Sequence, residues 1–311
     1  MNELFSILTP ELLAASIRIA APIILAAMGG LLCVKAKVFN IALEGFMLIG
    51  AFFGIMAIEF SGGNVWVGLL AGAVSGVLAS FIYSFCVLKL STDHVITSIG
   101  MNLLASGLTA TLLRLVFDTS GTFRPTAIAR IPEIQIPFLV NVPVLGEALG
   151  HHSPIVYISF LVVILTYVLL MKTPFGLAIR SVGEHADAAR TAGIHPEKVQ
   201  FLAITWSGAL CGLAGAYISS ILVSQFIENM IQGRGFTAFI AIVFGGYKPF
   251  YGLLAALLFG FSEALGIRFE LIGFGIPPSI IKTFPYLLSV IVLVVSSIIR
   301  SRNKLSTSIR S

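Results

Sequence analysis

The sequence predicts an all-α, polytopic membrane protein of about 8–10 transmembrane helices that contains an inverted internal repeat. Of its 311 residues, 57% are hydrophobic and only 11% are charged, and its mean hydropathy is +1.01. Soluble domains usually contain about 25% charged residues. Apolar runs of about 20 residues, long enough to cross a bilayer, recur from end to end. Because they leave no room for a soluble domain of ordinary size, residues 1–311 are predicted to form a single transmembrane domain.

The apolar runs define the predicted spans. We place spans near residues 12–33, 41–60, 65–88, 95–117, 154–171, 199–223, 235–247, 250–268 and 283–300. The run at 235–247 is short for a full crossing, so we expect a broken or re-entrant helix there. Residues 118–153 form the longest predicted external loop, rich in Pro and Ile, and we expect them to lie near the mouth of a pathway.

The distribution of Lys and Arg predicts which side of the membrane each loop occupies, because cytoplasmic loops are enriched in these residues. If residues 172–198 are placed inside, twelve Lys and Arg residues fall on the cytoplasmic side and five, including Arg234, fall on external loops or outer span ends. This asymmetry predicts that residues 172–198 face the cytoplasm.

Two parts of the chain share a pattern of residues. Gly68-Leu-Leu-Ala71 recurs as Gly252-Leu-Leu-Ala255, and eight residues after its first glycine each stretch has another, Gly76 or Gly260. Matches in the same order indicate a repeat. A chance coincidence among abundant Gly, Leu and Ala residues is the alternative.

The predicted topology adds weight to the repeat. Gly45-Phe46 matches Gly235-Phe236, and each pair opens an apolar segment. The span at 41–60 is expected to run outward and the segment at 235–247 inward. Similar sequences inserted in opposite directions are typical of alternating-access transporters.

The most polar stretch of the chain, residues 172–198, contains helix start and stop signals. Ser181 and Glu184 have the spacing of a capping box, and Asp187 follows near the positive end of the helix dipole. Gly193 is placed to end the helix in the left-handed conformation, with Pro196 soon after. These signals predict one helix over residues 181–193.

A separately capped helix is more than a connection between two spans requires, which favours a docking role with a cytosolic partner. Its small residues, Ala186, Ala188, Ala189 and Ala192, would let another protein approach closely. The alternative, an amphipathic helix on the membrane surface, lacks the usual Trp, Phe or Leu face.

Three motifs in this chain resemble a known family. Residues 183–194, GEHADAARTAGI, closely resemble the cytoplasmic motif of permeases in ABC importers of the ribose, nucleoside and branched-chain amino acid class. Residues 39–45, FNIALEG, and 233–245, GRGFTAFIAIVFG, resemble two further signatures of that class. Their forms are most similar to the shorter of the two paired permeases in nucleoside and simple-sugar transporters, and the resemblance covers nearly the whole chain.

The resemblance implies a set of partners. They are a cytosolic ABC ATPase, a second permease subunit that is a paralogue or a second copy, an extracytoplasmic substrate-binding lipoprotein and the lipid of a bacterial inner (cytoplasmic) membrane. The chain has no G-x-x-x-x-G-K-[ST] phosphate loop, so ATP is expected to bind the partner ATPase and not this chain. We expect no cofactor, metal, nucleic acid or catalytic residue here, so the chain is predicted not to be an enzyme.

The resemblance also implies that the 172–198 segment contains the coupling helix that sits in a groove of the ATPase. The matching residues are Gly183, Glu184, Asp187, Ala188, Ala189, Ala192 and Gly193.

Polar side chains within the spans are candidates for the translocation pathway. An ionisable group at the bilayer centre costs about 2.5–3.5 kcal/mol on insertion scales, so it must face protein or water. Our pathway or gating candidates are Asn40, Glu44, Gly45, Asn102, Gly233, Arg234 and Gly235. The competing interpretation is that Glu44 fixes helix packing by bonding backbone donors or an arginine.

Phe46 and Phe236 could stack on a nucleobase, and core packing is the competing interpretation for both. We therefore expect a permease subunit of an ATP-driven importer for nucleosides or simple sugars. A branched-chain amino acid permease is one alternative. An ion-coupled secondary transporter is another, and it would have only Glu44 and Glu263 as intramembrane carboxylates.

Overall fold

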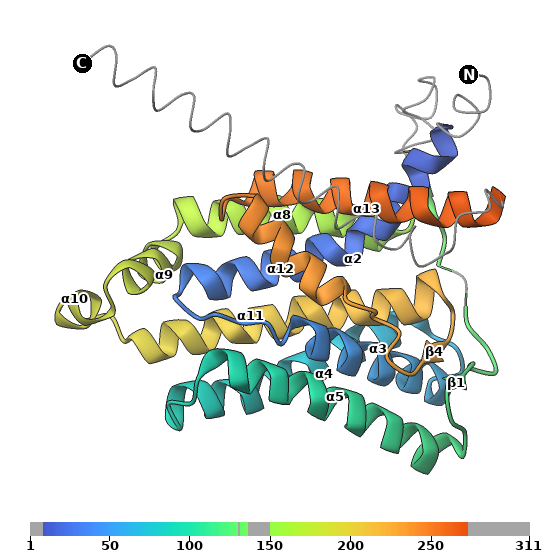
Figure 1. The fold of residues 1–311 in the computed structure, drawn as a ribbon, viewed down its shortest axis with the longest axis horizontal. Helices are drawn as coiled ribbons and strands as arrows, with labels where there is room; N and C mark the ends of the chain where they lie inside the picture. Colours follow the sequence, from blue (N-terminus) through green and yellow to red (C-terminus); the bar gives the residue numbers. More distant parts are fainter. Residues whose placement is uncertain (1–8, 130, 136–149, 273–311) are drawn as a thin grey trace.

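The computed structural model describes residues 9–129, 131–135 and 150–272, and this part of the chain is an all-α, multi-pass membrane bundle (Figure 1). It contains seven helices long and apolar enough to span a bilayer. These are α2 (Pro10–Lys35), α3 (Leu43–Phe60), α4 (Val65–Ser84) with the π-helical turn η1 (Phe85–Lys89), α5 (His94–Phe117), α8 (Pro154–Lys172), α11 (Pro196–Tyr217) with the π-helical turn η2 (Ile218–Leu222), and α13 (Pro249–Ile272).

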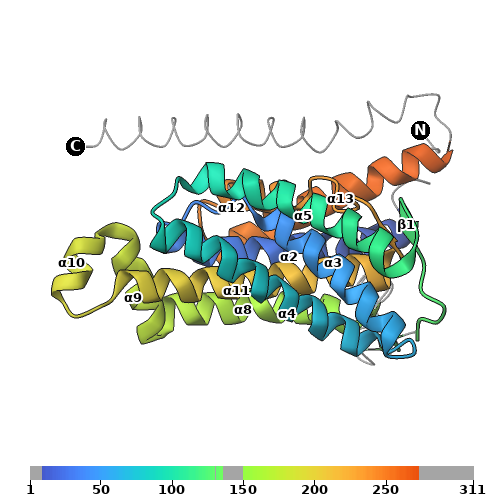
Figure 2. The same ribbon diagram turned by 90° about the horizontal axis from the view of Figure 1, so that it is seen from below.

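The remaining elements lie between or beyond these spans. The predicted broken element is the short apolar helix α12 (Arg234–Phe244). Helices α9 (Pro174–Glu184) and α10 (Ala186–Thr191) project from one end of the bundle (Figure 2). The span predicted at 283–300 lies outside the described residues.

Short antiparallel strand pairs order the opposite end of the bundle. Strand β1 (Thr122–Phe123) pairs with β4 (Phe226–Ile227), and β2 (Ile134–Gln135) pairs with β3 (His151–His152). The β1–β4 pair joins the predicted external loop to the connector that leads into α12.

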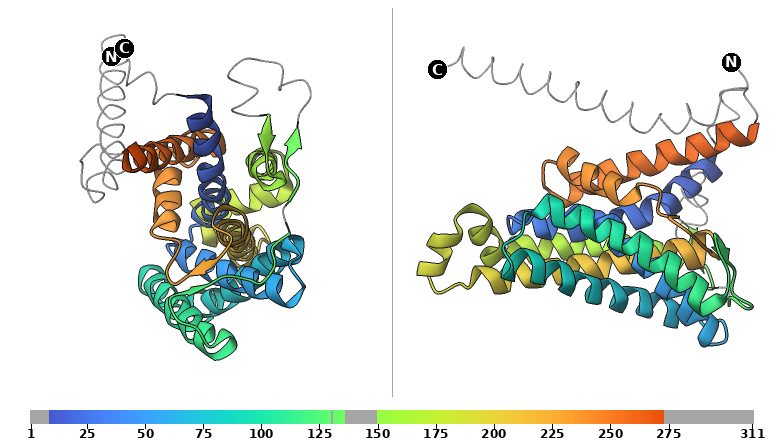
Figure 3. Two further views of the ribbon diagram at one scale, coloured as in Figure 1. Left: turned by 90° about the vertical axis from the view of Figure 1, so that its right-hand side faces the viewer. Right: turned by 60° about the horizontal axis from the view of Figure 1, so that its bottom comes forward.

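Helices α2 and α11 form the centre of the bundle, as the end-on view of Figure 3 shows. Helix α11 packs against α2, α3 and α4, whereas α12 and α13 pack against α2. Helix α5 lies at the edge, and most of its surface is exposed in the isolated chain. The exposed faces are rich in Leu, Ile and Phe, as expected for surfaces that meet lipid or another protein subunit.

The internal repeat is visible in the directions of the helices. Helices α3 and α12 both begin near the middle of the bundle and leave in opposite directions, α12 toward the end that carries α9 and α10 (Figure 1). Helices α4 and α13 also run opposite to each other. The duplicated segments are therefore inverted, as the sequence predicts.

The repeated glycines make matched contacts. A Cβ added at Gly76 of α4 would lie 2.1 Å from the carbonyl oxygen of Gly208 in α11. A Cβ added at Gly260 of α13 would lie 2.7 Å from the carbonyl oxygen of Ser16 in α2. Such close backbone approach is what small residues permit between membrane helices. Helix α4 thus contacts α11, whereas its counterpart α13 contacts α2. This difference is expected if α2, α3 and α4 of one repeat correspond to α11, α12 and α13 of the other.

We expect Gly76→Val to destabilise the bundle by about 1–3 kcal/mol, the usual range for overpacking a tight contact. Its extra methyl groups would meet the backbone of α11. The control is Gly100→Val in α5, where an added Cβ meets nothing within 4 Å. Thermal unfolding in detergent measures the difference. Equal melting temperatures for the two variants would contradict the close α4–α11 contact.

Candidate pathway site and coupling segment

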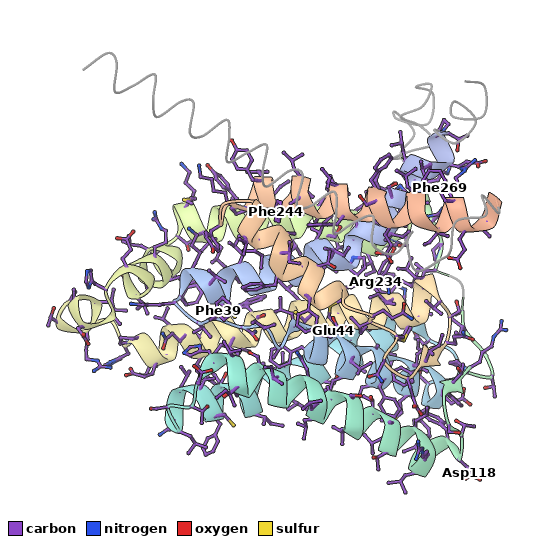
Figure 4. All side chains as sticks on the ribbon, viewed as in Figure 1. Phe39, Glu44, Asp118, Arg234, Phe244 and Phe269 are labelled. Carbon is purple, nitrogen blue, oxygen red and sulfur yellow. The ribbon has the colours of Figure 1, made fainter. Side chains whose placement is uncertain are left out.

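The N-termini of two inverted helices, the long α3 and the short α12, meet at Glu44, which lies near the middle of the bundle (Figure 4). A Cβ added at Gly235 would lie 2.4 Å from the backbone nitrogen of Glu44. Glycine is needed at this position because any side chain would push the two helix starts apart.

The Glu44 carboxyl group caps α12 across this contact. Its Oε1 accepts a hydrogen bond from the Gly233 N–H at 2.8 Å, and its Oε2 accepts one from the Gly235 N–H at 2.7 Å. The first N–H groups of a helix have no partners within that helix, and its N-terminus carries partial positive charge. Gly233, with φ of 86°, adopts the left-handed conformation that glycine tolerates best. Glu44 thus binds backbone donors, as the packing interpretation expects, and the bonds join the two repeats.

Two asparagines stabilise the start of α3. The Asn102 Oδ1 accepts a hydrogen bond from the Gly45 N–H at 2.8 Å, and its Nδ2 donates to the Ile41 carbonyl at 3.3 Å. The Asn40 side chain is fully buried, and its Oδ1 accepts a hydrogen bond from the Ala42 N–H at 2.9 Å. Irregular backbone inside a membrane requires such internal partners, so these side chains allow the break between α2 and α3.

Arg234 lies near the middle of the bundle, at the first residue of α12 (Figure 4). This position corrects its assignment to an external loop or outer span end. A count of Lys and Arg residues in loops cannot recognise a helix that starts inside the membrane. The guanidinium group pairs with Glu263 of α13 and also donates to the Met230 carbonyl at 3.3 Å. The ion pair links α12 to α13 beside the Glu44 contact.

The two candidate aromatic residues occupy different environments. Phe46 is fully buried and packs edge to face on Tyr83, with ring centroids 6.0 Å apart. Because its ring is covered by protein, the structure favours the core-packing interpretation for Phe46. Phe236 is 43% exposed and stays a candidate.

Ser106 is a polar residue that sequence reasoning missed. Its Oγ donates a hydrogen bond to the Oδ1 of the exposed Asn229 at 2.7 Å, which joins α5 to the connector before α12. Its position four residues after Asn102 in an apolar helix was the available signal, since residues so spaced share a face.

The segment 172–198 contains two helices, so the prediction of one helix over 181–193 is wrong. Helix α9 begins at Pro174, where the Thr173 Oγ1 accepts a hydrogen bond from the Gly176 N–H at 3.1 Å. Ser181 lies inside α9 and donates to the Ala178 carbonyl, so it is not a cap. His185 is extended, with φ of −145°, and separates α9 from α10.

The end of α10 follows the sequence prediction. Asp187 lies in its first turn and Arg190 in its last. Gly193, with φ of 83°, is left-handed, and Pro196 then opens α11.

The predicted coupling residues divide into packed and exposed groups. A Cβ added at Gly183 would lie 2.1 Å from the Lys35 carbonyl oxygen at the end of α2, and Ala189 is 4% exposed. Gly183 and Ala189 therefore belong to the packed side of the segment. The exposed candidates for docking are Glu184, Asp187, Ala188, Ala192 and Gly193.

The sequence also matches the model of a known protein family. Residues 12–295 match the model for the branched-chain amino acid transport system / permease component. The chain belongs to this permease family. Members of the family are transport components of multi-pass membrane complexes and not enzymes.

The chain is similar over nearly its whole length to named permeases. It is 36% identical to the guanosine ABC transporter permease protein NupQ of Bacillus subtilis, over 94% of this chain and 92% of NupQ. It is 32% identical to the nucleoside ABC transporter permease protein NupC of Lactococcus lactis, over 92% of each chain. The glucose ABC transporter permease protein TsgB13 of Haloferax volcanii is 30% identical over 85% of this chain but only 71% of its own length. The chain is thus an ABC transporter permease subunit, and such a permease works with a separate ATPase.

In this permease the three signature motifs have distinct positions. Residues 39–45 and 233–245 meet at Glu44 in the centre, whereas residues 183–194 form the end of α9, α10 and the turn that follows. Two motifs therefore build the junction of the repeats, and the third forms the projecting segment.

Proposed function

We propose that this permease forms the translocation pathway of an importer for nucleosides in a bacterial cytoplasmic membrane. A cytosolic ATPase drives it, and an extracytoplasmic substrate-binding lipoprotein delivers the solute. The cargo assignment is supported by the names of NupQ and NupC, two relatives that match over more than nine-tenths of this chain. A simple sugar is the second candidate, because TsgB13 is also a relative.

The observation that supports transport most strongly is the meeting of two inverted helix starts at Glu44. Discontinuous helices at the interface of inverted repeats form the central sites of many transporters. Helices that begin or end inside the membrane place polar groups at the centre of the bundle, and a transported solute must pass this region. The Glu44 bonds hold the starts of α3 and α12 together in the conformation described here.

The packing of α9 suggests how ATPase closure reaches this centre. Helix α9 contacts α2, α8 and α11, and Gly183 packs directly on the end of α2. Helix α9 contacts both α2, which packs on α12 and α13, and α11, which packs on α3 and α4, so a push on α9 would move the two repeats relative to each other. Such rocking of one repeat against the other changes which side of the membrane the centre faces.

The second permease subunit is proposed to be a longer paralogue. The chain spans 92% of NupC but 71% of TsgB13, so it corresponds in length to the shorter kind of permease. The exposed apolar face of α5, beside Ser106 and Asn229, is a surface on which a second permease could complete the pathway.

Uptake competition tests the cargo. In cells that depend on this permease, we expect uptake of labelled guanosine, inhibited by excess adenosine or uridine and unaffected by excess ribose, glucose or leucine. Cells that lack the chain provide the background. Inhibition by glucose but not by nucleosides would replace the nucleoside assignment with the sugar assignment.

A further inference from the structure

An open apolar groove lies between the end of α4 and the start of α11, at the end of the bundle that carries α9 and α10. Its volume is about 820 Å³. Phe81 and Phe85 line one wall and Phe201 and Leu202 the other. The Phe81 and Phe201 rings are stacked, with centroids 5.4 Å apart and planes 19° apart. The groove lining is therefore mostly apolar and aromatic, which suits an apolar chain.

The α4 wall of the groove is built by a π-helical turn, η1. The Leu90 N–H donates to the Phe85 carbonyl five residues earlier at 3.2 Å. Such turns are rare and are found frequently at functional sites. The wider turn places Phe85, Leu88 and Lys89 along the groove.

Ser84 lies at the start of this turn and also lines the groove. Its hydroxyl is buried and has no hydrogen-bond partner within the part of the chain that the structure describes. A buried polar group without a partner is costly, so such groups usually have one. The unpartnered hydroxyl therefore suits a ligand that carries an oxygen acceptor as well as an apolar chain.

Positive charge borders the groove. Lys89 and Lys198 both line it and are both exposed. The carboxylate beside them, Glu197, is paired with Arg190 of α10. The two ammonium groups are therefore available for an anion, and phosphate oxygens are favourable partners for lysine.

We propose that this groove binds an anionic phospholipid. Its phosphate lies between Lys89 and Lys198, its glycerol ester oxygens accept a hydrogen bond from Ser84, and an acyl chain lies on Phe81, Phe85 and Phe201. The two lysines at the rim favour an anionic headgroup over a zwitterionic one. Because only the short turn 192–195 separates α10 from α11, the lipid also holds the base of the coupling segment.

Native mass spectrometry of the purified transporter complex tests the proposal, with phosphatidylglycerol and phosphatidylcholine as probes. We expect wild type to retain phosphatidylglycerol in preference to phosphatidylcholine. The double variant Lys89→Ala with Lys198→Ala should lose that preference, by about tenfold or more in relative affinity. The matched control is Lys37→Ala with Lys172→Ala, which removes two exposed lysines outside the groove.

A second variant tests the apolar part of the site. Phe201→Ala should weaken retention of both lipids, since it removes the stacked pair while leaving the lysines in place. Thermal unfolding of each variant without added lipid verifies that the fold is intact. Equal retention of the two lipids by wild type, or an unchanged preference in the Lys89/Lys198 variant, would overturn the proposal. Cysteine cross-linking from position 201 to the second permease subunit would also overturn it, by showing that a protein covers the groove.

Discussion

Glu44→Gln is expected to reduce nucleoside uptake about tenfold or more while the protein still folds and inserts. A carboxylate can accept hydrogen bonds on both oxygens, whereas the amide offers one acceptor and one donor. In the variant, the N–H of Gly233 or of Gly235 would face an NH₂ group and lose its partner. An unsatisfied buried donor costs about 1–3 kcal/mol, and here the cost falls on the contact that joins the two repeats. Initial rates of labelled guanosine uptake measure the effect.

The matched control is Glu59→Gln at the other end of the same helix. Glu59 accepts hydrogen bonds from the backbone N–H and hydroxyl of Thr126, and these contacts are exposed. Water can replace an exposed partner, so this variant should transport within about twofold of wild type. Normal uptake by Glu44→Gln would assign the Glu44 bonds to packing alone and remove them from the transport mechanism.

Ala188→Arg is expected to abolish coupling between ATP hydrolysis and uptake. Ala188 is exposed on α10, so a long charged side chain there would leave the fold intact but keep a docked protein at a distance. Uptake should fall at least about tenfold, as it does when binding loses about 1.4 kcal/mol or more. Co-purification of the ATPase and substrate-stimulated ATP hydrolysis should fall together with uptake.

Two further variants separate docking from folding. Ala189→Arg places the same side chain in a buried position, so we expect loss of folded protein and not selective uncoupling. Thr92→Arg adds the same charge to an exposed loop at that end of the bundle and should keep uptake near normal. Normal uptake by Ala188→Arg, or equal losses in Ala188→Arg and Thr92→Arg, would contradict docking on α10.

The long helices could be predicted because a bilayer requires about 20 apolar residues in each span, whatever the rest of the fold. The break before α12 could also be predicted, since residues 235–247 are too few for a crossing. The boundaries of α9 and α10 could not. Ser181 and Glu184 fit a capping box by spacing, but Thr173 and Pro174 start the helix earlier, and only the backbone shows which signal is used.

The centre of the site depends on tertiary contacts that spacing alone does not provide. Glu44 and Gly235 are far apart in sequence, and the matching Gly-Phe pairs indicate only that their segments are related. Phe46 and Phe236 occupy equivalent repeat positions, yet Tyr83 covers the first ring and the second is exposed. Exposure of an aromatic residue in such an apolar chain is decided by neighbouring helices, so sequence could not separate the two.

The most direct measurement of the central claim is guanosine uptake by the assembled transporter with its ATPase inactivated and the proton gradient left intact. If a separate ATPase drives this permease through α10, uptake against a concentration gradient will stop. Dissipating the proton gradient while ATP is maintained will leave the uptake of the active complex unchanged. Continued accumulation of guanosine with the inactive ATPase would contradict the account and favour an ion-coupled transporter.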